Sequence, residues 1–433
     1  MTRAISRPGW IALALAAATG LILILAATAA GAGTLLFGAP VEYYLFGLML
    51  VGIALLHERA GTVALTGLAV IIAYQGLVSG FPTGHGVDAL GRHLAHEWVV
   101  FANIFLLLVG FELLSNQFEQ SNLPDHLPTL LPDNWTGGLS LLAIVFVMSA
   151  FLDNIAAAVL GGVMARHVYQ SRVSVGFLAA IVASANAGGA GSVIGDTTTT
   201  LMWLHGVSPI AVLPAYLAAV PAFVIFGLAG AWQQHRFQPI QADAAPGHPL
   251  QWRRIGIVFF ILTAAVTANV VANMSGAGEE SAPWLGLALW AAILVTSLFA
   301  RPDWSVMRAG AKGAVFLVAL VAAASLMPVS GLPEPSWSSA FALGALSSLF
   351  DNIPLTVLAL QQGGYDWALL AYAVGFGGSM VWFGSSAGVA LTNEFPEGRS
   401  VVAWLRQGWF VPVAYVAGFF IMLGIAGWHP SAG

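Results

Sequence analysis

Apolar runs long enough to cross a lipid bilayer recur along the chain, and they constrain its fold more than any other feature. Examples are residues 62–79, 98–115, 209–232 and 255–274. A membrane-spanning helix needs roughly 17–25 such residues. Charged residues make up only 8% of the chain, against about 25% of a typical soluble domain. The sequence therefore excludes a soluble enzyme, a nucleic-acid-binding protein and a disordered chain, and it predicts an all-α polytopic membrane protein.

Two pairs of similar segments divide the chain into halves. FLDNIAAAVL (Phe151–Leu160) matches LFDNIPLTVL (Leu349–Leu358), and GGAGSVIGDT (188–197) aligns without gaps on GGSMVWFGSS (377–386). In each half an Asp-Asn pair interrupts one apolar run and a Gly-Gly pair interrupts the next. Paired interrupted segments at corresponding positions of two halves indicate the substrate site of a transporter.

The order of the apolar runs gives both halves the same plan. Each has three helices, a re-entrant hairpin with Asp-Asn at its tip, a broken helix and a closing helix. An odd number of crossings in each unit makes the two repeats inverted relative to each other. We therefore expect a leading transmembrane helix (1–35), a first inverted repeat (36–232), a cytoplasmic linker (233–254) and a second inverted repeat (255–433).

The positions of the basic residues predict the orientation. With a cytoplasmic N-terminus and two re-entrant hairpins, every arginine and lysine except Arg92 lies on the cytoplasmic side, as the positive-inside rule requires. Hairpins that crossed the membrane completely would place the arginines after Met164 on the wrong side. We expect a multi-pass protein of the cell inner (cytoplasmic) membrane with a periplasmic C-terminus.

Four carboxylates fall within the predicted membrane region: Glu112, Asp153, Asp196 and Asp351. A charged side chain at the bilayer centre costs about 3 kcal/mol or more, so such a residue usually marks an ion path. In the alternative interpretation, Glu112 extends to the interface and the aspartates only cap half-helices. Four threonines follow Asp196 directly, which favours ion binding at this residue.

The residues around these carboxylates are typical of a site for a hard cation. Glycines allow the backbone to open and expose carbonyl groups, and hydroxyl and amide oxygens are hard ligands. No arginine or lysine falls in the predicted middle of a membrane segment, so a cation carrier is favoured over an anion carrier. Burial favours the neutral form of a carboxyl group, so one carboxylate can bind either a proton or a metal ion. The glycines expected to open the backbone are Gly188, Gly189, Gly191, Gly195, Gly377, Gly378 and Gly384.

At these residues the chain resembles the NhaD-type sodium/proton antiporters of the wider ion transporter superfamily, which also includes arsenite permeases and citrate carriers. The resemblance lies in VGFELLSNQ around Glu112, in both Asp-Asn pairs, in SANAGGAGSVIGDTTTTLMW (184–203) and in GGSMVWFGSSAGV (377–389). It implies two inverted units in which a hairpin meets a broken helix at a central ion site. The ion-site residues that it implies are Glu112, Asp153, Asn154, Asn186, Asp196, Thr198, Thr199, Ser347, Asn352, Ser385 and Ser386. We add Asp351 as the counterpart of Asp153, and we expect sodium at Asp153 and Asp196.

The expected function is exchange of sodium or lithium for protons by alternating access. No catalytic residue and no cofactor are expected, because ion gradients drive such a carrier. The expected partners are monovalent cations, protons and the lipid bilayer, with no nucleic acid, and the sequence is compatible with a homodimer. Two alternatives stay open: an anion, arsenite or dicarboxylate carrier of the same superfamily, and a non-transporting membrane scaffold.

Overall fold

The computed structural model describes residues 18–20, 35–36, 39–56, 59–126, 131–241, 249–274, 282–328 and 332–430. Apart from residues 18–20 and Leu35, the expected leading helix (1–35) lies outside this part of the chain. A two-residue antiparallel ribbon of β1 (Leu35–Leu36) and β2 (Ala39–Pro40) comes before the helices. The remaining described elements are helical.

Four helical segments of the described residues are long and apolar enough to cross a membrane: Ala60–Ser79, Val87–Glu119, Pro209–Phe237 and Trp304–Ser325. A fifth candidate is the pair Val401–Gln407 and Phe410–Ala426, which is bent by 61°. Several apolar helices of 10–17 residues accompany them. This composition is consistent with an all-α polytopic membrane protein.

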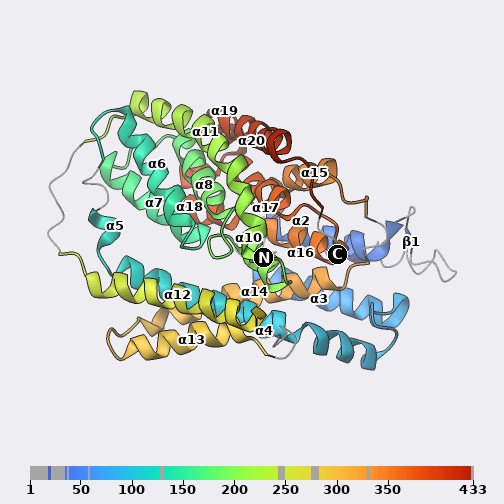
Figure 1. Ribbon diagram of the computed structural model, residues 1–433. Helices are drawn as coiled ribbons and strands as arrows, with labels where there is room; N and C mark the ends of the chain where they lie inside the picture. Colours follow the sequence, from blue (N-terminus) through green and yellow to red (C-terminus); the bar gives the residue numbers. More distant parts are fainter. Residues whose placement is uncertain are drawn as a thin grey trace, which may run out of the picture.

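The order of helices recurs in the two halves (Figure 1). The first half contains α2 (Val41–Leu55), α3 (Ala60–Tyr74), η2 (Gln75–Ser79), α4 (Val87–Glu119), α5 (Leu123–His126), α6 (Trp135–Ser149), α7 (Asn154–Val168), α8 (Val175–Gly189), α9 (Thr197–Leu204), α10 (Pro209–Val212), η4 (Leu213–Ala215) and α11 (Tyr216–Phe237). The second half contains α12 (Trp252–Met274), α13 (Trp284–Ser297), η5 (Trp304–Val306), α14 (Met307–Ser325), α15 (Trp337–Ser347), α16 (Asn352–Gln362), α17 (Trp367–Gly377), η7 (Gly378–Met380), α18 (Ser386–Glu394), η8 (Pro396–Arg399), α19 (Val401–Gln407) and α20 (Phe410–Ala426).

Both interrupted regions break where the sequence places the interruptions. The first hairpin (α6 and α7) is divided at Asp153 and the second hairpin (α15 and α16) at Asp351, each of which is the N-cap residue of the following helix. The first broken helix consists of α8 and α9, and the second of α17, η7 and α18.

Two helix boundaries differ from the sequence-based expectation. α4 begins at Val87, eleven residues before the apolar run at Trp98, because its polar first turns contain no proline and Asp88 favours the helix N-terminus. The polar segment 233–254 is helical at both ends, since α11 continues to Phe237 and α12 starts at Trp252. Hydropathy marks the apolar part of a helix and not its ends.

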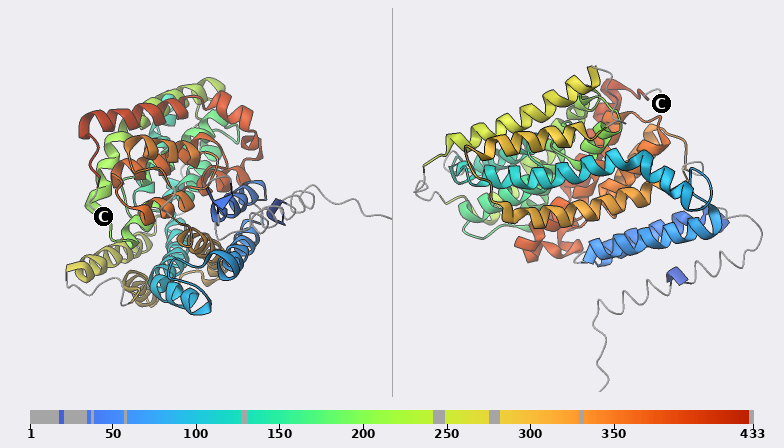
Figure 2. Two further views of the ribbon diagram at one scale, coloured as in Figure 1. Left: turned by 90° about the vertical axis from the view of Figure 1, so that its right-hand side faces the viewer. Right: turned by 90° about the horizontal axis from the view of Figure 1, so that it is seen from below.

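The helices form two groups. α4 packs against α12, α13 and α14, and α14 also packs against α3. The left view of Figure 2 shows these long helices below a block that contains both hairpins and both broken helices. The two groups meet where α16 packs against α14 and where α9 contacts α4.

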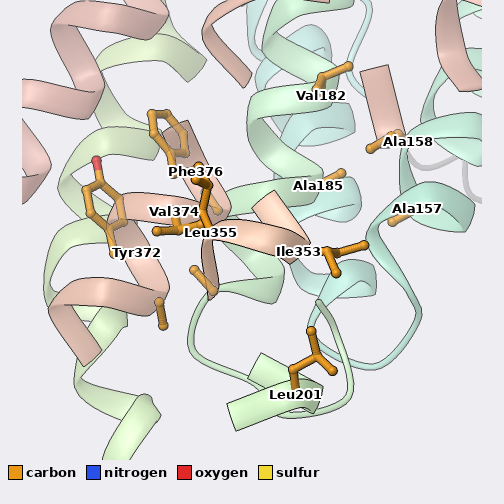
Figure 3. Close-up of a cluster of buried hydrophobic side chains, with 14 of the residues drawn as sticks. Ala157, Ala158, Val182, Ala185, Leu201, Ile353, Leu355, Tyr372, Val374 and Phe376 are labelled. Atoms are coloured by element: carbon orange, nitrogen blue, oxygen red, sulfur yellow. The ribbon is translucent and has the colours of Figure 1, made fainter. Parts of the chain in front are cut away.

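The two broken helices form the centre of the upper block. Every residue of α8 is buried, as is every residue of α17 from Ala368 to Gly377. A helix that is apolar on all sides belongs in a core. Figure 3 shows side chains of α7, α8, α9, α16 and α17 converging around Ile353 and Ala185. The ends of α8 and α17, where both helices break, therefore lie deep inside the protein.

A stack of aromatic rings fixes the position of α17. Phe376 stacks on Phe226 of α11 with ring centroids 5.7 Å apart and on Tyr372 at 5.3 Å. The Tyr372 hydroxyl donates to the Ala414 carbonyl of α20 at 3.0 Å. The backbone between Tyr372 and Gly377 is thereby held between two long helices.

Candidate functional site

Asp196 lies at the centre of a buried polar cluster. It is fully buried and is the N-cap residue of α9, with its Oδ1 accepting from the Thr198 backbone N–H at 3.2 Å. The same oxygen accepts from the Nδ2 atoms of Asn154 and Asn352, each at 3.3 Å. The asparagines that follow the breaks in both hairpins therefore meet at one carboxylate.

The second carboxylate oxygen of Asp196 has no hydrogen-bond partner. Oδ2 is buried, and so is the Thr198 hydroxyl oxygen beside the carboxyl group; neither atom has a hydrogen-bond partner within 3.5 Å. A buried polar atom without a partner costs about 1–3 kcal/mol, and more if it is charged. A bound proton or cation would remove this cost at Oδ2.

Gly375 provides the space beside Oδ2. A Cβ atom at this position would lie 2.6 Å from Asp196 Oδ2, closer than carbon and oxygen can pack. Gly375 aligns with Asn186 of the first half when the glycine segments are superposed. The sequence reasoning missed Gly375, although this alignment could have identified it.

Asn186 connects the two broken helices. Its Oδ1 accepts from Asn154 at 3.0 Å, while its Nδ2 donates to the hydroxyls of Ser379 at 2.9 Å and Ser385 at 3.1 Å. All four side chains are buried. The sequence analysis also missed Ser379. This residue aligns with an alanine in the first half, so comparison of the two halves does not reveal it.

The two hairpin aspartates have different surroundings. Asp351 accepts from the Ser386 hydroxyl at 2.8 Å and lines a cavity of about 250 Å³ with Ser386 and Asn393. Asp153 lines a cavity of only about 10 Å³ with Thr197, which is the counterpart of Ser386. The duplicated carboxylates thus occupy unequal spaces in the same structure.

Several expected ligands instead hold the backbone together. Ser347 donates to the Val374 carbonyl at 2.7 Å, and its counterpart Ser149 donates to the Ala185 carbonyl at 2.5 Å. The Thr199 hydroxyl donates to the carbonyls of Ser192 at 2.5 Å and Asp196 at 2.9 Å. The two serines bind each broken helix to its hairpin. Thr199 satisfies carbonyl groups that the break has freed within the first broken helix.

Glu112 lies on the α4 side of Asp153 and takes no part in the hydrogen bonds of the cluster. It is exposed on α4, and its Cβ faces Gly310 of α14, where an added Cβ would come within 3.1 Å. Glu112 makes no hydrogen bond or ion pair within the described part of the chain. The structure therefore places Glu112 within range of electrostatic interaction with Asp153, but outside the hydrogen-bonded cluster around Asp196.

The seven glycines of the broken helices let neighbouring groups pack closely against the backbone, and none of them is needed for an unusual backbone angle. None has a positive φ. A Cβ at Gly188 would overlap the Phe146 carbonyl oxygen, and one at Gly377 would overlap the Gly344 carbonyl oxygen. Gly195 and Gly384 are restricted in the same way by carbonyls at the hairpin tips. Small residues let helix backbones come this close.

The charged and polar groups near the three aspartates determine which ligands a cation could have. No group of three or more His, Cys, Asp or Glu residues able to hold a metal occurs among the described residues. The ion pair of this part of the chain, Arg166 with Glu394 at 3.4 Å, involves none of the three aspartates. A cation at Asp196 would be bound by one carboxylate and by neutral oxygens, a set that suits a hard monovalent ion.

Known proteins with similar sequences are named as sodium/proton antiporters. No protein-family model matches the chain. The sodium/proton antiporter 1 of Arabidopsis thaliana is 27% identical over 359 residues, which cover 74% of this chain and 59% of that protein. The Na⁺/H⁺ antiporters NhaD of Vibrio parahaemolyticus and Halomonas elongata are 24% and 25% identical, covering 72% and 86% of this chain and 87% and 84% of theirs.

The chain thus spans less than two thirds of the Arabidopsis relative and most of the length of the bacterial relatives. All three relatives are named as transporters and not as enzymes. Together with the apolar helices of a multi-pass membrane protein, these relatives at about 25% identity support an NhaD-type antiporter family for this chain.

Proposed function

We propose that the protein exchanges sodium or lithium for protons across the cytoplasmic membrane, with both ions competing for Asp196. The unpartnered Oδ2 of this buried carboxylate carries the proposal. The relatives named as Na⁺/H⁺ antiporters support the same activity at the level of the family.

Competition at one oxygen is sufficient for antiport. When Asp196 is protonated, Oδ2 is neutral and suits its buried position; when sodium binds, the cation compensates the charge. Thr198 offers an unused hydroxyl oxygen two residues along the chain. Coupling requires that the carrier reorients only when Oδ2 holds a proton or a cation. Each proton that moves in one direction is then matched by a cation that moves in the other.

Packing between the halves favours two inverted repeats and alternating access. α7 of the first hairpin packs against α18 of the second half, and α16 of the second hairpin packs against α9 of the first. The two contacts are equivalent under the repeat. Because Asn154 and Asn352 share Asp196 Oδ1, movement of either hairpin changes the ion site.

Everted membrane vesicles from a host without its own antiporters test the function. Addition of sodium or lithium to acidified vesicles should release protons, which a fluorescent pH indicator reports. An anion or dicarboxylate carrier would respond to its anion and not to sodium, and a scaffold would respond to neither. The absence of any sodium- or lithium-dependent proton release would contradict the proposal.

The proposed topology has its own test. We propose re-entrant hairpins, a cytoplasmic N-terminus and a periplasmic C-terminus, since only Arg92 then lies outside. Alkaline phosphatase fused after His429 should be active, and green fluorescent protein fused there should be dark. Fusions after Gln241, between α11 and α12, should show the opposite pattern and serve as the control. A fluorescent fusion after His429 would overturn the re-entrant hairpins.

A further inference from the structure

An apolar groove lies between the first hairpin and the beginning of α12. Its volume is about 550 Å³, within the range of ligand pockets. Val147, Phe151 and Leu152 line it on the hairpin side, and Val258 and Phe259 line it on the α12 side. Figure 1 shows α12 passing below this hairpin. Phe151 and Phe259 are 57% and 70% exposed, so the groove opens toward the surroundings of the protein.

Positive charge gathers at one end of this groove. Phe118 and Ile255 line it there, and the residues next to them, Gln117 and Arg254, are joined by a hydrogen bond from the Arg254 guanidinium. Arg254 also donates to Gln251 at 3.0 Å, which fixes its position. Arg253 beside it is exposed.

This positive charge is not neutralised within the described part of the chain. Neither arginine forms an ion pair there, and neither does Glu119, which follows Phe118. The N-terminus of the 23-residue α12 adds a further partial positive charge at the same place. Trp252, 71% exposed beside the arginines, is the kind of side chain that marks a membrane interface.

The groove and the arginines together fit one class of ligand. We propose that an anionic phospholipid of the bilayer binds here, with its phosphate at Arg253 and Arg254 and one acyl chain in the groove. A zwitterionic lipid would match the groove, but its own cationic group would offset its phosphate, so it would bring no net negative charge to the two arginines. A soluble anion would use the arginines alone. Basic pockets between membrane helices are known sites for anionic headgroups.

The position of the groove gives the lipid a structural effect. Phe151 and Leu152 directly precede Asp153 and Asn154 at the tip of the first hairpin, and Asn154 donates to Asp196. An acyl chain packed against Phe151 and Leu152 would support the tip from outside. The bound lipid therefore stabilises the cluster around Asp196 without contacting it.

Native mass spectrometry and thermal unfolding of the purified full chain test this proposal. Dioleoylphosphatidylglycerol should be retained and should raise the melting temperature, whereas dioleoylphosphatidylcholine should do so less. Arg253→Gln should weaken phosphatidylglycerol binding about fivefold, the scale expected for one arginine at an anionic surface. Arg406→Gln, which changes an exposed arginine of α19, should behave like the wild type.

Val147→Trp tests the apolar part, because an indole would fill the groove and reduce retention of the lipid. Arg253→Gln changes an exposed residue and keeps the test valid even if Val147→Trp fails to fold. Equal retention of both lipids by the wild type, or unchanged phosphatidylglycerol binding by Arg253→Gln, would overturn the proposal. Stabilisation by inorganic phosphate equal to that by phosphatidylglycerol would also overturn it, since the groove would then contribute nothing.

Discussion

Replacement of Asp196 by asparagine is expected to abolish sodium/proton exchange while the protein still folds and inserts. The amide keeps the shape of the side chain and one oxygen that can accept from Asn154, Asn352 and Thr198. It replaces Oδ2, which has no partner in the structure, with a group that binds neither a proton nor a cation. Because neither ion can then bind at this position, sodium-dependent proton release should fall to the level of vesicles that lack the protein.

The measurement is sodium-dependent proton release from everted vesicles, with size-exclusion chromatography of the purified variant as the test of folding. Asp303→Asn is the matched control, because Asp303 lies in an exposed segment and caps only the short helix η5. If Asp196→Asn kept exchange with an unchanged pH profile, the coupling role would pass to Asp153 or Asp351. If asparagine variants of all three aspartates were active, the cation-antiporter proposal would be wrong.

Gly375→Ala is expected to weaken sodium binding strongly without unfolding the protein. The new methyl group would lie 2.6 Å from Asp196 Oδ2 and would compete with a cation for the space beside this oxygen. Alanine favours a helix by about 1 kcal/mol over glycine, so α17 itself should not suffer. We expect the sodium concentration for half-maximal exchange to rise about tenfold or more, as when a ligand's support is removed at a metal site.

The matched control for this variant is Gly424→Ala in α20, where an added Cβ meets nothing within 4 Å. Stabilisation of the purified protein by sodium, measured by thermal unfolding, should decrease in Gly375→Ala in parallel with transport. A half-maximal sodium concentration equal to that of the wild type would show that the cation does not bind beside Oδ2.

The sequence alone singled out the carboxylate and the two hairpin asparagines that lie in the buried cluster, together with the segments that carry them. Asp196, Asn154 and Asn352 are recognisable because polar residues are rare in apolar runs and because the Asp-Asn pair occurs twice. The positions of both helix breaks follow from the same signal. Each of these features depends on residues that are close together in the chain.

Features that depend on how helices cross were not predictable in this way. Gly375 matters because the end of α17 passes beside Asp196, and Ser379 matters because it faces Asn186. The sequence suggested that glycines such as Gly188 open the backbone, whereas the structure shows that they admit a neighbouring carbonyl group. Close contacts between separate helices have no local signature.

Each half of the protein supplies a helix that packs against the other half, and this has a consequence for the order in which the protein folds during synthesis. α7 packs against α18 and α9 against α16, so the first half lacks two of its packing partners until the second half has been synthesised. Proteins are made from the N-terminus, and their segments begin to fold during synthesis. Asp196 and Asn154 are therefore synthesised some two hundred residues before Asn352 and Ser385. Until then the polar cluster is incomplete. Synthesis of this chain thus passes through a stage at which the first hairpin and the first broken helix are made but lack part of their packing.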